Sequence, residues 1–149
     1  KKMPKSGHIE IFDRSWYGRV LVERVEGFAS QNEWQRASDE INQFEKMWTD
    51  EGTIILKFFL CLDKDEQLKR FKDRENNPDK QWKITEEDWR NREKWDEYLE
   101  ASQDMIESTN TSYAPWYIVP ADHKKTGRIE VLKTIIRKCE EVLWGVKTY

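Results

Sequence analysis

The sequence contains few cysteines and histidines. Cys61 and Cys139 lie far apart in apolar surroundings, and no Cys-x-x-Cys pair or Cys/His cluster accompanies them. This scarcity disfavours a disulfide framework and a zinc site, and it predicts two buried thiols in a reducing cytoplasm. His8 and His123 form no recognisable nucleophilic set with a serine or a cysteine, so we predict ordinary surface or packing roles for both.

Long hydrophobic runs are also missing. The longest, Ile54–Leu62, has nine residues and contains Lys57, whereas a membrane helix needs roughly 20. The first seven residues lack the apolar core of a signal peptide. We therefore expect no membrane partner and place the protein in the cytoplasm.

Charged and aromatic residues are abundant. Charged residues make up 37% of the 149 positions, hydrophobic residues another 37%, and there are eight tryptophans. This composition argues against disorder, and the length suits one domain with a buried core. The formal net charge of −3 gives no overall attraction to nucleic acid or to other polyanions, so any anion site has to be local.

Alternating strand and helix patterns predict an α/β fold with a parallel sheet flanked by helices. Three predicted helices begin at capping pairs: Ser30 with Glu33, Asp63 with Glu66, and Thr85 with Asp88. The predicted strands are 8–13, 53–62 and 113–120, and the predicted helices are 30–52 (closed by Gly52), 63–75, 85–107 and 126–144. We expect strand 53–62 to be buried on both faces. We expect the last helix to bury Ile129, Leu132, Ile136, Cys139 and Leu143.

Asp13 is the first candidate for chemistry because it ends the predicted strand 8–13. In open α/β sheets, ligands bind beyond the carboxyl ends of the strands. A carboxylate at that place can hold Mg²⁺ directly or through water, as the Walker-B aspartate does in phosphoryl transfer. An apolar strand that ends in aspartate is common, however, and a helix-capping role for Asp13 is an equal alternative.

Arg14 and Arg19 follow Asp13 closely. Guanidinium groups bind phosphate oxygens through paired hydrogen bonds. Residues 1–24 contain six Lys or Arg against three Asp or Glu, on a chain that is acidic overall. These residues favour a phosphate site near Asp13. The alternative is a solvated surface on which the arginines pair with Glu10, Glu23 and Glu26.

A second basic segment surrounds the break at 76–79. Its basic residues are Arg70, Lys72, Arg74, Lys80, Lys83, Arg90 and Arg92. A flap that carries arginines can close over phosphates, exclude water and neutralise the charge of the transferring group. Acidic residues are interleaved throughout, so a solvated, charged helix hairpin is the alternative, and composition alone favours it.

The stretch Asp13-Arg-Ser-Trp-Tyr17, within 7–27, resembles the Walker-B signature of type-2 polyphosphate kinases. The resemblance continues in order over nearly the whole chain, at 40–45, 57–60, 66–74, 78–83, 88–98 and 113–116. It implies a P-loop kinase fold related to thymidylate kinase, with a helical lid. It also implies an enzyme that uses Mg²⁺ to move phosphoryl groups between inorganic polyphosphate and nucleotides, yielding nucleoside di- and triphosphates such as ATP. The sequence looks closer to the polyphosphate:AMP phosphotransferase branch than to the others.

The resemblance further implies roles for single residues. Asp13 would be the aspartate on Mg²⁺, and Arg14 and Arg74 would clamp the phosphate chain. In one partial kinase domain, 1–29 would form the Walker-B strand and loop, about 75–95 the lid, and 126–144 the C-terminal helix. Lesser substrate-binding candidates are Arg19, Lys80, Lys83 and Arg92.

One motif of such kinases is absent, because no Gly-x4-Gly-Lys-Ser/Thr phosphate loop occurs in the 149 residues. We therefore expect a fragment of the domain that lacks the first strand and loop and has no kinase activity by itself. We also expect a homo-oligomer. The alternatives are a non-catalytic module that binds polyphosphate, nucleotides or a partner and, less favoured, the lid half of an ordinary nucleoside monophosphate kinase.

Overall fold

The computed structural model describes residues 3–13 and 15–145, which form two compact units. The described residues of Lys1–Glu45 and Lys94–Thr109 make up unit 1, and those of Lys46–Glu93 and Asn110–Tyr149 make up unit 2. The chain therefore passes between the units three times. No helix within the described ranges is long and apolar enough to cross a membrane.

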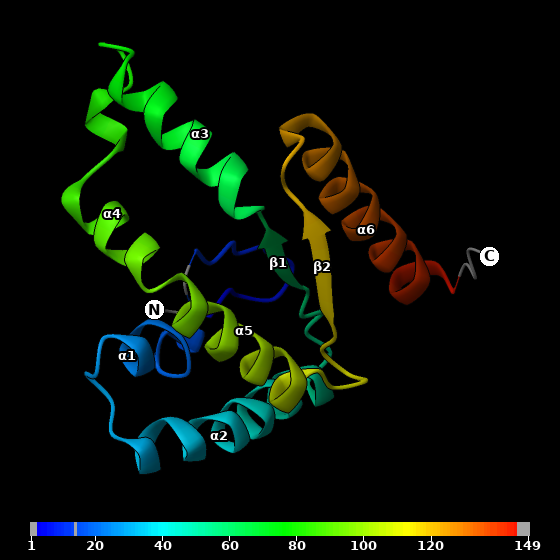
Figure 1. The fold of residues 1–149 in the computed structure, drawn as a ribbon. Coiled ribbons are helices and arrows are strands. Elements are labelled where there is room, and N and C mark those ends of the chain that lie inside the picture. The colour runs from blue at the N-terminus through cyan, green and yellow to red at the C-terminus, as the bar shows by residue number, and fades with distance from the viewer. Residues whose placement is uncertain (1–2, 14, 146–149) are drawn as a thin grey trace. The chain divides into compact units, whose positions relative to one another are not determined.

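Unit 1 is helical (Figure 1). Its elements are the 3-10 turn η1 (Trp16–Gly18), the short helix α1 (Val22–Val25), α2 (Gln31–Asp50) as far as Glu45, and α5 (Trp95–Thr109). Arg24 joins α1 to α5, because its guanidinium lies 2.7 Å from Asp104 and 3.3 Å from Glu100. The buried apolar residues of this unit include Val20, Ala37, Ile41, Ala101 and Met105.

The start of α2 follows the predicted capping pair. The backbone N–H and the hydroxyl of Ser30 both donate to Oε2 of Glu33, at 2.8 and 2.7 Å. These hydrogen bonds hold the pKa of Glu33 below its ordinary value. Gly52 follows the end of the helix with a φ of +87°, a left-handed conformation that glycine adopts without strain. Both ends of this helix are therefore as predicted.

Unit 2 contains a parallel two-stranded sheet (Figure 1). Strand β1 (Lys57–Cys61) pairs with β2 (Trp116–Pro120) in a register that runs from Lys57 opposite Trp116 to Cys61 opposite Pro120. Helix α6 (Lys124–Trp144) lies beside β2. A Cβ atom on its buried Gly127 would lie only 3.0 Å from the carbonyl oxygen of Pro120. A small residue at this point lets the helix approach the strand closely.

The rest of unit 2 is a helical hairpin. Helix α3 (Lys64–Glu75) leads to a 3-10 turn η2 (Gln81–Lys83), and α4 (Glu86–Glu93) returns alongside α3 (Figure 1). The buried Phe71 of α3 meets Trp89 of α4 edge-on, with ring centroids 5.1 Å apart. The indole of Trp89 also donates to Oε1 of Glu75 at 3.2 Å. The helix break at 76–79 is thus where the prediction placed it.

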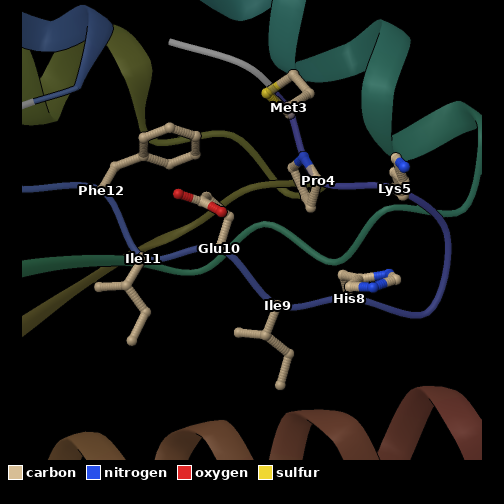
Figure 2. A pocket seen from close by; sticks show the side chains of 8 residues that line it. All are labelled: Met3, Pro4, Lys5, His8, Ile9, Glu10, Ile11 and Phe12. Carbon is tan, nitrogen blue, oxygen red and sulfur yellow. The ribbon is translucent and has the colours of Figure 1, made fainter.

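The predicted strand 8–13 is wrong as an element of the sheet. Figure 2 shows Ile9 and Ile11 on one side of this segment and Glu10 and Phe12 on the other, so the chain is extended as its alternating pattern indicates. No strand is assigned to it, however, and the exposed fractions of Ile9 and Ile11 are 86% and 87%. Alternation specifies an extended chain, but a strand also has to pair with another strand, and the strands assigned within the described residues are β1 and β2.

The predicted long helix 85–107 is two helices, α4 and α5, interrupted at Lys94. The residues on the two sides of the break bind different neighbours. Arg92 is hydrogen-bonded to α3, whereas the Lys94 ammonium lies 3.3 Å from both the Val25 carbonyl and Glu26 at the end of α1. Charge and helix propensity continue through this point in the sequence, so only the tertiary contacts reveal the break.

Three burial predictions are also wrong. Strand β1 is not buried on both faces, since Leu60 is 60% exposed and Cys61 is exposed rather than a buried thiol. Helix α6 contacts β2, with Gly127 next to Val119 and Pro120, and the buried residues of the helix are Gly127 and Thr134. Its predicted core face is more than half exposed at four positions, Ile129, Leu132, Ile136 and Leu143, and Cys139 is half-buried. Spacing identified the apolar stripe of α6, but the neighbouring strand lies against the small residues instead.

Candidate active site

Asp13 is exposed at the end of the extended segment 8–12. The chain before it reverses direction at 6–7, where the His8 N–H donates to the Lys5 carbonyl at 3.1 Å. The residues on both sides of this turn surround an open hollow of about 470 Å³ (Figure 2). It is lined by Met3, Pro4, Lys5, His8, Ile9, Glu10, Ile11 and Phe12. Asp13, an exposed residue, directly follows the last of these residues.

The loop that follows Asp13 is attached to α2 through a buried glutamate. Glu45 is 0% exposed, and its Oε1 accepts hydrogen bonds from the Trp16 indole at 3.1 Å and from the Tyr17 hydroxyl at 2.7 Å. The Trp16 ring also packs against the Phe12 ring, with centroids 5.4 Å apart. Packed aromatic side chains therefore hold the chain on both sides of Asp13.

Tyr17 is a hydrogen-bond donor in this arrangement and not an acid or base near neutral pH. Burial raises the pKa of its hydroxyl far above the ordinary value, and the hydrogen bond to Glu45 raises it further. The Thr109 hydroxyl, which is also fully buried, donates to the Met105 carbonyl of its own helix at 2.5 Å. The polar groups under the Asp13 loop are thus fixed in place by hydrogen bonds.

The two arginines predicted beside Asp13 have different outcomes. Arg14 lies outside the described residues. Arg19 lies 2.6 Å from Glu23 and 3.9 Å from Glu33, with side chains that are exposed by more than a third. The structure therefore agrees with the alternative prediction, in which Arg19 pairs with Glu23 on a solvated surface. A role for Arg19 in substrate binding stays a prediction.

Three candidates of the second basic segment lie at the tip of the hairpin in unit 2. Arg74 donates from Nη1 to the Lys83 carbonyl at 3.4 Å, and both Lys80 and Lys83 are exposed. The Lys83 ammonium is 4.9 Å from the ring of Trp82, which is 75% exposed. The tip therefore brings together three cationic side chains and an aromatic face, groups that suit a phosphate chain or a nucleotide.

Arg92 lies at the base of the hairpin instead. Its Nη1 donates to the Lys64 carbonyl at 2.6 Å and to Oε1 of Gln67 at 2.9 Å. These two hydrogen bonds join the end of α4 to the start of α3. Arg92 therefore supports the hairpin, and its role in binding substrate stays a prediction.

The carboxyl ends of β1 and β2 are joined by a polar network. The Asp63 N–H donates to Oδ1 of Asp122 at 2.9 Å. Arg70 donates to the carbonyls of Ala121 and Asp122 at 2.8 and 2.7 Å, and to Oε1 of Glu66 at 2.9 Å. The hydrogen bond from Arg70 is the main cause that lowers the pKa of Glu66. Arg70 thus ties the hairpin to the loop between β2 and α6.

A comparison with known families places the chain in one of them. The family model described as "Polyphosphate kinase 2 (PPK2)" matches residues 1–143. The chain belongs to the polyphosphate kinase 2 family.

Relatives agree with this assignment. The chain is 60% identical over 134 residues to a polyphosphate:AMP phosphotransferase of Acinetobacter johnsonii. The aligned residues make up 90% of this chain and 28% of the relative. A polyphosphate kinase 2 structure from Arthrobacter aurescens is similar over 99% of this chain and 50% of its own, with a TM-score of 0.89 and 39% identity. A putative polyphosphate kinase 2 structure from Pseudomonas aeruginosa gives a TM-score of 0.86 and 52% identity over 91% of this chain and 29% of its own.

The comparisons confirm two predictions made from the sequence. The first is the resemblance to type-2 polyphosphate kinases. The second is an α/β fold with parallel strands flanked by helices, which the chain shares with polyphosphate kinase 2 structures of the P-loop kinase type. The chain spans about 28% of the length of the Acinetobacter johnsonii relative.

The possible ligand groups around Asp13 determine which kind of metal ion this polyphosphate kinase 2 chain could bind there. In the part of the chain that the structure describes, no three His, Cys, Asp or Glu side chains gather into a metal site. Mg²⁺ keeps several waters and is commonly bound by one or two carboxylates together with substrate phosphates. A single exposed aspartate fits an ion of this kind.

Sequence reasoning missed two residues of this polyphosphate kinase 2 chain that shape the site. Glu45 lies four residues after Ile41 and eight after Ala37, so it falls on the buried stripe of α2. A glutamate at such a position is rare unless it is paired, and this was the available signal. Arg70 was grouped with the other cations of its segment, and nothing in the sequence distinguishes it from the exposed Lys69 beside it.

Proposed function

We propose that the protein that carries this chain transfers phosphoryl groups between inorganic polyphosphate and nucleotides, with AMP as the first acceptor. The observation that carries this proposal is the high identity, over nine tenths of the chain, to a relative that is a polyphosphate:AMP phosphotransferase. The exposed Asp13 and the cationic hairpin tip support it, since both suit a substrate rich in phosphate.

Asp13 is proposed as the Walker-B aspartate that holds Mg²⁺. Bound there, the ion would neutralise charge on the phosphates as the phosphoryl group is transferred. The chain's own contribution is to hold the Asp13 carboxylate exposed and in one place, through the packed aromatic side chains on either side. Arg14 is proposed to clamp the phosphate chain beside it.

The segment of about 75–95 is proposed as the lid. Lys80 and Lys83 within it, and Arg74 just before it, would bind phosphate oxygens at the tip of the hairpin, where the guanidinium can form paired hydrogen bonds and the ammonium groups act as compact charges. Arg92 and the Phe71–Trp89 contact hold the two arms together, so that the tip moves as one piece. A rigid lid would exclude water from the transferring group.

We further propose that the 149-residue chain alone does not catalyse this transfer, since it contains no Gly-x4-Gly-Lys-Ser/Thr loop to cradle the β- and γ-phosphates. The complete enzyme is proposed to act in the cytoplasm as a homo-oligomer.

The experiment is a phosphorylation assay with the full-length gene product. We expect AMP to be phosphorylated with polyphosphate and Mg²⁺ as donor system, ADP less efficiently, and AMP with ATP as sole donor not at all. Activity with ATP alone would identify an ordinary nucleoside monophosphate kinase, and binding of polyphosphate without transfer would identify a non-catalytic module. Transfer by the purified 149-residue chain would contradict the proposed inactivity of the chain alone.

The lid is tested in the same assay with matched lysine variants. Lys83→Met removes a cation at the hairpin tip, and we expect the KM for polyphosphate to rise about threefold to tenfold with a smaller change in the KM for AMP. Lys69→Met, which removes an exposed cation from the outer surface of α3, is the control and should leave both constants near those of the wild type.

A further inference from the structure

Glu45 is a carboxylate with no exposed surface on a helix of otherwise ordinary amphipathic pattern. Burying such a group is costly unless hydrogen bonds compensate. Its Oε1 accepts hydrogen bonds from the Trp16 indole and the Tyr17 hydroxyl, and these two residues are adjacent in η1. Both follow Asp13 within four residues, so the buried carboxylate is bonded to the loop that carries the exposed one.

Aromatic rings on both sides of Asp13 in the sequence also pack together. The Phe12 and Trp16 rings lie 5.4 Å apart. The Trp16 ring in turn packs edge-on against Phe44, with centroids 5.0 Å apart. The contacts of Trp16 and Tyr17 therefore converge on two successive residues of α2, Phe44 and Glu45.

We propose that Glu45 is a positioning residue for Asp13. By holding Trp16 and Tyr17, it fixes the backbone on which the Asp13 carboxylate stands, and it thereby sets the affinity of that carboxylate for a divalent cation. This inference rests on the proposed function, in which Asp13 binds Mg²⁺. Outer groups that orient a ligand often change metal affinity strongly without touching the metal.

A purely structural role for Glu45 makes a different prediction. A carboxylate that only satisfied two buried donors would affect the stability of unit 1 and nothing else. A carboxylate that positions Asp13 also affects metal affinity, and the size of that effect should follow the number of hydrogen bonds lost to Trp16 and Tyr17. Metal affinity and the environment of the Trp16 indole are therefore the readouts that separate the two roles.

The test uses the full-length gene product labelled with 5-fluorotryptophan. The ¹⁹F resonance that is present in the wild type and absent from the Trp16→Phe variant is assigned to Trp16. Mn²⁺, which takes oxygen ligands as Mg²⁺ does, is titrated and its free concentration is measured by electron paramagnetic resonance. Glu45→Leu removes the acceptor at similar volume, and we expect the Mn²⁺ dissociation constant to rise about 10-fold and the Trp16 resonance to move. Glu45→Gln keeps an acceptor oxygen and should restore both to near their wild-type values.

Ser102→Ala is the matched control, because Ser102 is a buried polar residue of unit 1 whose hydroxyl donates to the Tyr98 carbonyl of its own helix. It should leave Mn²⁺ affinity unchanged. Unchanged affinity in Glu45→Leu as well would overturn the inference. If that variant does not fold, Tyr17→Phe decides: a weaker Mn²⁺ complex supports the positioning role, and unchanged affinity overturns it. Asp13→Asn tests the proposed function separately, since Mn²⁺ binding unaffected by this change would remove the role of Asp13 itself.

Discussion

Replacing Arg70 with methionine should loosen the connection between the hairpin and the sheet. The Arg70 side chain is 16% exposed and donates to two backbone carbonyls, those of Ala121 and Asp122, at 2.8 and 2.7 Å. Each of these hydrogen bonds contributes about 1–1.5 kcal/mol net, and methionine retains the packing of the aliphatic stem. The expected loss is about 2–3 kcal/mol for the two carbonyl bonds together.

Hydrogen exchange of residues 116–128, followed by mass spectrometry, measures this loss locally. An opening free energy lower by 2–3 kcal/mol corresponds to exchange about 30- to 140-fold faster. Arg70→Lys should recover less than half of the effect, because one ammonium cannot reproduce the planar fork. Exchange accelerated less than threefold in Arg70→Met, or full recovery by lysine, would refute the reasoning.

The Arg70 variant should also change a titration. The hydrogen bond from Arg70 is the main cause of the lowered pKa of Glu66, so Arg70→Met should return that pKa towards its ordinary value. A carboxyl group whose pKa is lower in the folded state than in the unfolded state stabilises the fold at pH values above its unfolded-state pKa. This contribution is lost as the pH falls through its folded-state pKa. The advantage of the wild type over Arg70→Met should therefore shrink below about pH 4.5. Carboxyl carbon NMR of Glu66 provides the measurement.

Three further variants test other parts of the structure. Arg92→Met removes the two hydrogen bonds that join α4 to α3, and amides of 86–93 should exchange faster while those of α2 do not. Tyr17→Phe should destabilise the protein by about 1–2 kcal/mol in urea unfolding at pH 8. Because the pKa of Tyr17 is raised on folding, the stability advantage of the wild type over this variant should shrink as the pH rises above 10. An advantage that grows with pH would contradict the assigned hydrogen bond to Glu45. Glu33→Gln should weaken protection of the first turn of α2 at neutral pH, and its deficit should disappear as the pH falls below about 4.5, since the hydrogen bonds from Ser30 lower the pKa of Glu33.

Local rules predicted the elements whose determinants lie within a few residues. The capping pairs Ser30–Glu33 and Thr85–Asp88 form in the structure as hydrogen bonds. Asp63 caps α3 by accepting from the N–H groups of Asp65 and Glu66. The parallel pairing of β1 with β2 follows from two strands separated by helices.

Features that depend on distant partners could not be predicted in this way. The apolar stripe of α6 follows from its spacing, but which of its faces meets β2 depends on the close approach that Gly127 allows. The alternation of 8–12 gives an extended chain, and a strand would require a backbone partner in addition. At the site, composition cannot distinguish Arg92, which is bonded to α3, from Lys83, which is exposed at the tip.

The central claim, that Asp13 serves Mg²⁺-dependent phosphoryl transfer from polyphosphate, is tested most directly by the kinetics of Asp13→Asn in the full-length gene product. Asp39→Asn, which alters another exposed aspartate of unit 1, is the matched control. We predict that Asp13→Asn lowers kcat/KM for polyphosphate-dependent AMP phosphorylation by about 100-fold or more, with Asp39→Asn near the wild type. An Asp13→Asn enzyme within about threefold of the wild type over the full range of Mg²⁺ concentrations would contradict the account.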